Sequence, residues 1–315
     1  MSRVAASTVV VLSALCVHCG GTQTITAPTS LTSGAAGSDP LPNPVGTPAP
    51  LASLPPAVVV AAGDIGLCTG AGNPEATARL IDSIGGTVFA LGDNAYPSGS
   101  AQDYRDCYDR TWGRHKAQTR PVPGNHEYET PNAIPYFDYF GANAGPPGLG
   151  YYSFEVGSWH AVALNSNIAV GAASSQGAWL RADLAGSRAK CTIAYWHFPL
   201  FSSGSHGNQA QMRDFWRILY EADADLVLGA HDHVYERFAP QDPDGLPDPQ
   251  RGIREFIVGT GGAGPQQFMS VRLNSEVRNN ASLGVLKLVL SADGYNWNFI
   301  QASGGPGDFG SGTCH

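Results

Sequence analysis

The chain has 315 residues, of which 43% are hydrophobic and 14% charged, so it has enough apolar material for one or two packed domains and is not wholly disordered. Glycine (39 residues) and proline (23 residues) are abundant, which indicates short elements joined by loops and excludes a coiled coil. The formal net charge of -8 leaves no basic face for a nucleic-acid backbone, so we expect no nucleic-acid partner.

Residues 1–19 are typical of an export signal, with Arg3 ahead of a short apolar run that cannot cross a bilayer. Cys16 and Cys19 stand where a bacterial lipoprotein would carry its lipidated cysteine, although neither follows the small residue that such a site prefers. Two alternatives therefore stay open: a lipid anchor as the only membrane contact, or plain cleavage and secretion. Residues 20–56 are rich in Pro, Thr, Ser and Ala and predict a linker.

Four cysteines remain after this leader. An even number in an exported chain predicts two disulfides, and none of the spacings matches a zinc knuckle. Three pairings stay open for Cys68, Cys107, Cys191 and Cys314.

From residue 57 onward, short continuous apolar runs alternate with helical patterns. Continuous apolarity predicts strands buried on both faces, and the alternation predicts an α/β sandwich. Strands are expected at 58–62, 87–91, 191–196 and 225–228, and helices at 74–84, 101–116, 176–185 and 208–222. Residues 255–259 and a hairpin at 283–300 indicate antiparallel strands, which would make the sheet mixed. We place the folded domain at 57–302 and expect an irregular, glycine-rich tail at 303–315.

A side chain of the kind that binds metals follows each of five predicted strands, which are the four given above and the segment at 121–123. These side chains are Asp64, Asp93 with Tyr96, Asn125, His197, and His231 with His233. Each segment alone has an ordinary explanation as a turn or a helix cap. Open α/β sheets bind ligands at the carboxyl ends of their strands, so the agreement of all five in order and placement favours one shared site.

The chemistry of this set suits a pair of metal ions. Two carboxylates, one amide, one phenol and three imidazoles fit two first-row metals, whereas a structural zinc site would be rich in cysteine. One carboxylate can bridge two ions about 3.5 to 4 Å apart, and Asp93 is the candidate bridge.

The order of these motifs resembles that of the purple acid phosphatases, within the calcineurin-like metallophosphoesterases. The motifs are GDIG at 63–66, GDNAY at 92–96, GNHE at 124–127, YWH at 195–197 and AHDH at 230–233. The resemblance covers roughly 58–302 and implies a four-layer α/β/β/α sandwich with two mixed β-sheets, as in the single-domain bacterial members.

The resemblance also implies the ligands and the metals. It assigns one metal to Asp64, Asp93, Tyr96 and His233, and the other to Asp93, Asn125, His197 and His231. The first metal would be Fe(III), whose tyrosine ligand gives the purple colour. The second would be Fe(II), Zn(II) or Mn(II).

Two residues depart from the family pattern. Ala230 replaces the usual glycine before the histidine pair, and Glu127 replaces the commoner aspartate after His126. Neither change removes an expected ligand. Outside the motifs, His160 lies in an apolar run and is expected to be a buried structural residue.

The export signal predicts a secreted, periplasmic or cell-surface protein, and the resemblance implies that it is a phosphatase. It would hydrolyse small phosphomonoesters through in-line attack by a hydroxide that the metals hold. His126 and His206 match histidines outside the metal shell and are candidates for a proton donor or a hydrogen-bonding group. Two alternatives stay open: a phosphodiesterase or nucleotide pyrophosphatase on the same scaffold, and a surface lipoprotein that binds metal or phosphate without turnover. The complete ligand set argues against the second.

Overall fold

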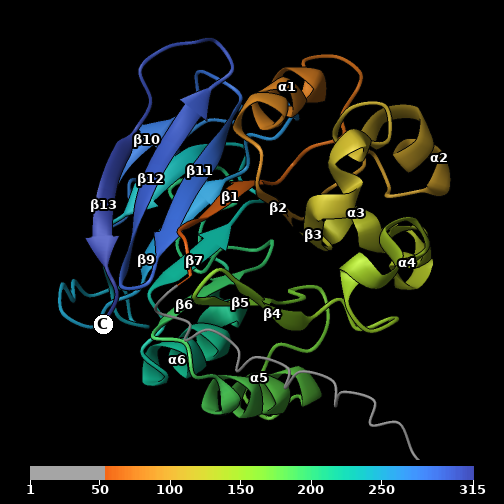
Figure 1. Cartoon of the computed structure of the whole chain (residues 1–315). Helices are drawn as coiled ribbons and strands as arrows, with labels where there is room; N and C mark the ends of the chain where they lie inside the picture. Colours follow the sequence, from red (N-terminus) through yellow and green to blue (C-terminus); the bar gives the residue numbers. More distant parts are fainter. Residues whose placement is uncertain (1–53) are drawn as a thin grey trace, which may run out of the picture. The chain divides into compact units, whose positions relative to one another are not determined.

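The computed structural model describes residues 54–315, so the predicted signal at 1–19 and nearly all of the linker at 20–56 lie outside the described residues. The described part contains two mixed sheets that pack face to face, with helices outside them (Figure 1). Between the sheets, the ring of Tyr195 stacks on that of Phe89, with centroids 4.4 Å apart and planes at 14°. The four-layer sandwich that the resemblance implied is confirmed.

The first sheet has the strand order β13-β12-β11-β1-β2-β3. Its parallel strands are β1 (Ala57–Ala62), β2 (Thr87–Leu91) and β3 (Thr119–Val122). Its antiparallel strands are β11 (Gly284–Ser291), β12 (Gly294–Gln301) and β13 (Phe309–Thr313). The hairpin predicted at 283–300 is confirmed as β11 and β12.

The second sheet has the order β10-β8-β9-β7-β6-β5-β4. The parallel strands are β5 (Trp159–Ala163), β6 (Cys191–Tyr195), β7 (Leu226–Gly229) and β9 (Arg254–Val258). The antiparallel strands are β4 (Tyr152–Val156), β8 (Tyr235–Phe238) and β10 (Ser275–Asn279). The segment expected at 255–259 as an antiparallel strand is β9, which runs parallel to β7 and antiparallel only to β8.

In the described part of the chain, six α-helices lie outside the two sheets (Figure 1). They are α1 (Pro74–Ile84), α2 (Ala101–Asp103), α3 (Asn125–Tyr128), α4 (Ile134–Phe140), α5 (Ser175–Gly186) and α6 (Arg213–Glu221). Short 3-10 turns lie at Trp112–Gln118, Pro131–Ala133, Gly141–Ala144 and Ala210–Met212, and a π turn lies at Tyr104–Tyr108. Helix α1 packs on β11, and α5 and α6 pack together over the second sheet (Figure 1).

Alternate residues of β6 belong to two different hydrophobic cores. Ile193 and Tyr195 point between the sheets, whereas Ala194 packs with Phe215 of α6 on the outer side. Because both faces of the strand are buried, its sequence is continuously apolar, as predicted. The strand is therefore fixed on both sides, and its carboxyl end is a rigid support for the loop that follows.

The segment at 101–116 differs from the single helix that we expected. It begins as α2 and the π turn, is interrupted, and continues as a 3-10 turn. At the interruption, the hydroxyl of Thr111 donates to the carbonyls of Cys107 and Tyr108 at 3.0 and 3.3 Å. A side chain that occupies backbone acceptors in this way competes with the helical ladder.

The tail at 303–315 is not irregular throughout, which corrects our expectation. Strand β13 pairs with β12, and Cys314 is disulfide-bonded to Cys191 of β6. A side chain at Gly310 would lie 2.3 Å from the ring of Trp297, so glycine is required for β13 to lie against that ring. The folded domain therefore extends to the C-terminus of the described chain.

The cysteines adopt one of the three pairings left open. Cys68 bonds to Cys107, and Cys191 bonds to Cys314. Within residues 54–315, no helix is long and apolar enough to cross a membrane.

Candidate metal site

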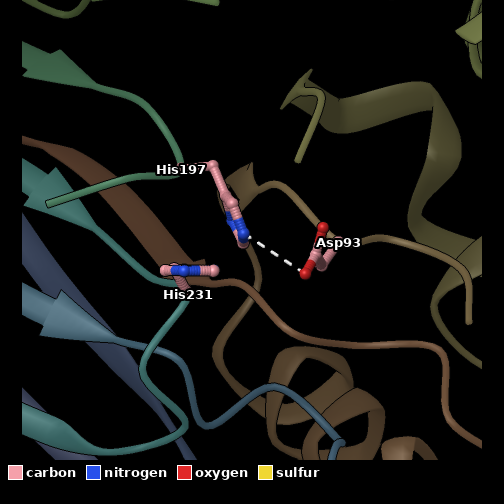
Figure 2. Close-up of side chains that lie close together, drawn as sticks. All are labelled: Asp93, His197 and His231. Carbon is pink, nitrogen blue, oxygen red and sulfur yellow. Dashed lines mark ion pairs between the residues drawn. The ribbon is translucent and has the colours of Figure 1, made fainter. Parts of the chain in front are cut away.

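The seven predicted ligands meet where β1, β2, β3, β6 and β7 end. Figure 2 shows three of them, Asp93, His197 and His231, which come from three different loops and point toward a common centre. One potential ligand atom of each of these three lies within 4.8 Å of those of the other two. The loops of five strands, remote in sequence, thus bring their polar side chains into one place.

One half of the site surrounds Asp64, which is fully buried. The Tyr96 hydroxyl donates to Asp64 Oδ1 at 2.9 Å, and His233 Nε2 lies 3.4 Å from the same oxygen. His233 Nε2 also lies 3.2 Å from the Tyr96 oxygen. Burial alone would raise the pKa of Asp64, but the neighbouring charge of His233 outweighs it and holds the pKa well below its usual range.

The other half surrounds Asp93, which is 2% exposed. Asp93 Oδ2 lies 3.2 Å from His197 Nε2 and 3.2 Å from the Tyr96 oxygen, so this carboxylate reaches both halves. Asn125 Oδ1 lies 3.1 Å from His197 Nε2. The ring of His231 lies 5.1 Å from that of His197, measured between centroids.

Two of the histidines are oriented by backbone carbonyls. Nδ1 of His197 lies 2.9 Å from the carbonyl oxygen of Leu91, and Nδ1 of His233 lies 2.9 Å from that of Gly264. Each Nδ1–H can donate there, which leaves Nε2 toward the carboxylates. Metal-binding histidines in proteins are usually oriented in this way.

The charges of the three histidines differ because their neighbours differ. Burial opposes a charged imidazole, but Asp93 outweighs burial for His197 and Asp64 does so for His233, which raises the pKa of each to about 9. For His231 the balance is reversed: burial and the charge of His197 outweigh the two carboxylates and lower its pKa to about 3. Without metal, His197 and His233 therefore balance the charge of the two carboxylates.

The backbone at the site is strained in a way that ordinary turns do not require. Asp64, Asp93 and His231 have φ angles of 57°, 48° and 71°, in the left-handed region that disfavours residues with a side chain. Gly92 has φ 88°, and a Cβ there would lie 2.7 Å from His197 Nδ1. The turns thus place ligands at a local cost in energy, as functional sites often do.

These residues fit a pair of cations. Two buried carboxylates normally require compensating positive charge, and within residues 54–315 the basic side chains that pair with Asp64 and Asp93 are histidines, which can themselves bind a metal ion when neutral. Burial and the adjacent carboxylates raise the pKa of the Tyr96 hydroxyl well above 10. A bound cation would reverse this effect, because it favours the phenolate and the neutral imidazoles as ligands.

His126 and His206, the predicted catalytic residues, lie on two sides of the ligands. The ring of His126 lies 4.3 Å from that of Tyr96, and its Nε2 lies 3.8 Å from Asp93 Oδ2. The ring of His206 lies 4.2 Å from that of His231. Both side chains are accessible to solvent.

Three residues near the site were not predicted to contribute to it. Glu127, recognised only as a departure from the family pattern, accepts hydrogen bonds from the amides of Asn94 and Gly124 at 2.8 and 2.7 Å. Burial raises the pKa of Glu127 to about 7, and the charge of Asp93 adds to this shift. Asp232 and Gln266 contact the His206 loop. The position of Asp232 between His231 and His233 could have indicated from the sequence that it supports the site. Gln266 lies outside all five motifs, so no sequence pattern marked it.

A sandwich of two mixed sheets whose strand ends supply carboxylate, imidazole and amide side chains to one site is the architecture of the metallophosphoesterases. The family model described as calcineurin-like phosphoesterase matches residues 57–235, and the chain belongs to this family. Membership implies a dinuclear metal centre.

Relatives with similar sequences and a solved structure with a similar fold are purple acid phosphatases. The chain is 31% identical to purple acid phosphatase 18 of Arabidopsis thaliana over 66% of its own length and 50% of the relative's. It is 27% identical to purple acid phosphatase 15 of the same plant, over 58% of its own length and 41% of the relative's. The chain thus spans about half the length of these relatives. Purple acid phosphatase PPD1 from yellow lupin seeds matches its fold with a TM-score of 0.70 at 17% identity, over 82% of this chain and 54% of that one.

Proposed function

We propose that this protein is a phosphatase that hydrolyses phosphate monoesters at a pair of metal ions. The observation that carries the proposal is the position of Asp93 Oδ2, 3.2 Å from both His197 Nε2 and the Tyr96 oxygen. A carboxylate between two groups of candidate ligands is the arrangement that a bridged metal pair requires. The similarity to plant purple acid phosphatases supports the same reaction class.

The proposed ligands fall into two overlapping sets. Asp64, Asp93, Tyr96 and His233 would hold Fe(III), and Asp93, Asn125, His197 and His231 would hold Fe(II), Zn(II) or Mn(II). When bound, the ions would supply Lewis-acid activation of water and positive charge next to the phosphoryl oxygens.

The chain's own residues bind and orient the ester. His126 stands beside Tyr96 and His206 beside His231, so a phosphate at the metals would lie within reach of a hydrogen-bond donor on each side. Such a donor stabilises the charge that develops on the phosphoryl and leaving oxygens. Small phosphorylated molecules are therefore the proposed substrates.

We also propose that the protein is exported. Two disulfides support this, because such bonds persist in oxidising compartments. The predicted signal and the alternative of lipidation at Cys16 or Cys19 fall outside the described residues.

The test is hydrolysis of p-nitrophenyl phosphate and of bis(p-nitrophenyl) phosphate by the purified, metal-loaded chain from acid to alkaline pH. A faster reaction with the monoester supports the proposal, and removal of metal with a chelator should abolish it. A faster reaction with the diester would instead support the phosphodiesterase alternative. No reaction with either ester while two metals are bound would support the non-catalytic binding protein.

A further inference from the structure

The side chain of Gln266, in the segment after β9, contacts both histidine loops. Its Oε1 accepts a hydrogen bond from the backbone N–H of His233 at 3.2 Å and from the hydroxyl of Ser205 at 2.9 Å. Its Nε2 lies 3.3 Å from His206 Nε2. Gln266 itself is anchored, because Asn280 Nδ2 donates to its backbone carbonyl at 2.9 Å.

The hydrogen-bonding partners determine which way the amide faces. A backbone N–H can only donate, so the oxygen of Gln266 must face His233. The amide nitrogen must then face His206, where it can only donate. His206 Nε2 is therefore the acceptor, and the ring proton of neutral His206 lies on Nδ1.

The loop that carries His206 is held independently. The backbone N–H of His206 donates to Asp232 Oδ1 at 2.8 Å, and Asp232 is fully buried. The hydroxyl of Ser202 donates to the other oxygen of Asp232. With its backbone fixed and its ring 4.2 Å from that of His231, His206 needs one more contact to set the ring's orientation, and Gln266 provides it.

We propose that Gln266 is a positioning residue for His206: it holds the ring beside the metal ligands with Nε2 as an acceptor and leaves Nδ1–H as the free donor for a phosphoryl or leaving oxygen. This inference rests on the proposed function. Within residues 54–315, no protein group accepts a hydrogen bond from His206 Nδ1.

The first test reads the tautomer directly, by ¹⁵N NMR of the histidine rings in the zinc-loaded chain, with His206→Asn to assign the signal. We expect His206 to carry its proton on Nδ1. In Gln266→Glu an oxygen would replace the amide nitrogen, so the proton should move to Nε2. Gln267→Ala, at an exposed neighbouring position, is the matched control and should keep the wild-type tautomer. An Nε2–H tautomer in the wild type, or no change in Gln266→Glu, would overturn the inference.

The second test is a kinetic double-mutant cycle. We expect His206→Ala to lower kcat about 10²-fold and Gln266→Ala about 10-fold, with zinc content unchanged in both. On the His206→Ala background, Gln266→Ala should lower kcat by less than about threefold, because the residue acts through His206. Fully multiplicative losses, or loss of zinc in Gln266→Ala, would indicate a merely structural role. If the wild type hydrolyses no ester, the proposed function fails, and the NMR result still decides the role of Gln266.

Discussion

Glu127 joins two of the ligand loops, so Glu127→Ala tests how the site is held. Its carboxylate accepts hydrogen bonds from the amides of Asn94 at 2.8 Å, Ala95 at 3.2 Å and Gly124 at 2.7 Å, and it is fully buried. Alanine leaves these three buried backbone donors without their acceptor, at about 1 to 3 kcal/mol each. Because water entering the cavity offsets part of this cost, we expect the free energy of unfolding to fall by about 3 to 5 kcal/mol.

The same substitution should weaken metal binding. Asp93 directly precedes Asn94, and Asn125 directly follows Gly124, so the lost hydrogen bonds release the backbone next to two proposed ligands. Loss of such a supporting contact typically lowers metal affinity about 10- to 100-fold.

The two effects are measured separately. Urea unfolding in the presence of a chelator gives the stability without metal, and calorimetric titration with Zn²⁺ gives the affinity. Glu129→Ala is the control, because Glu129 is exposed and lies at the end of the same helix. Wild-type stability together with wild-type zinc affinity in Glu127→Ala would refute the reasoning.

Three further predictions follow from the structure. Replacing Cys191 and Cys314 by alanine removes a bond between residues 123 apart in sequence and should lower the free energy of unfolding by about 2 to 5 kcal/mol; an unchanged denaturation midpoint would contradict the pairing. His160, buried as expected, has its pKa raised because Asp183, 2.8 Å away, and Glu155 outweigh burial. The contribution of His160 to the free energy of unfolding is therefore present below pH 6.5 and lost as pH rises through its folded-state pKa. We expect urea titrations at acid pH to show His160→Gln less stable than the wild type by about 1 to 2 kcal/mol, and this difference should shrink in alkali. A difference that grows with pH would contradict the direction of the pKa shift. In iron-loaded protein, Tyr96→Phe should abolish the visible absorption band, and persistent colour would exclude Tyr96 as the ligand that gives it.

Local patterns were sufficient to predict the elements that position the site. Residues 74–84 were predicted as a helix, which α1 confirms. In the structure the side chain of Asn73 caps this helix, and Pro74 is tolerated in its first turn. The strands that precede Asp64 and His197 were recognisable because burial on both faces makes them continuously apolar.

What could not be predicted depends on contacts between distant residues. Gln266 and His206 are 60 positions apart, and no local pattern marks their contact. Strand β13 was missed because its glycines are typical of loops, although here they allow close packing on Trp297. The pairing of Cys191 with Cys314 likewise depends on the position of that strand.

The proposal that Asp93 bridges two metals is tested most directly by elemental analysis of metal-loaded wild type and Asp93→Ala. Asp293→Ala, which changes an exposed aspartate in the turn between β11 and β12, is the control. We expect two metal ions per chain in the wild type and in the control, and neither ion in Asp93→Ala. Retention of two ions in Asp93→Ala, or fewer than two in the wild type, would contradict the proposal.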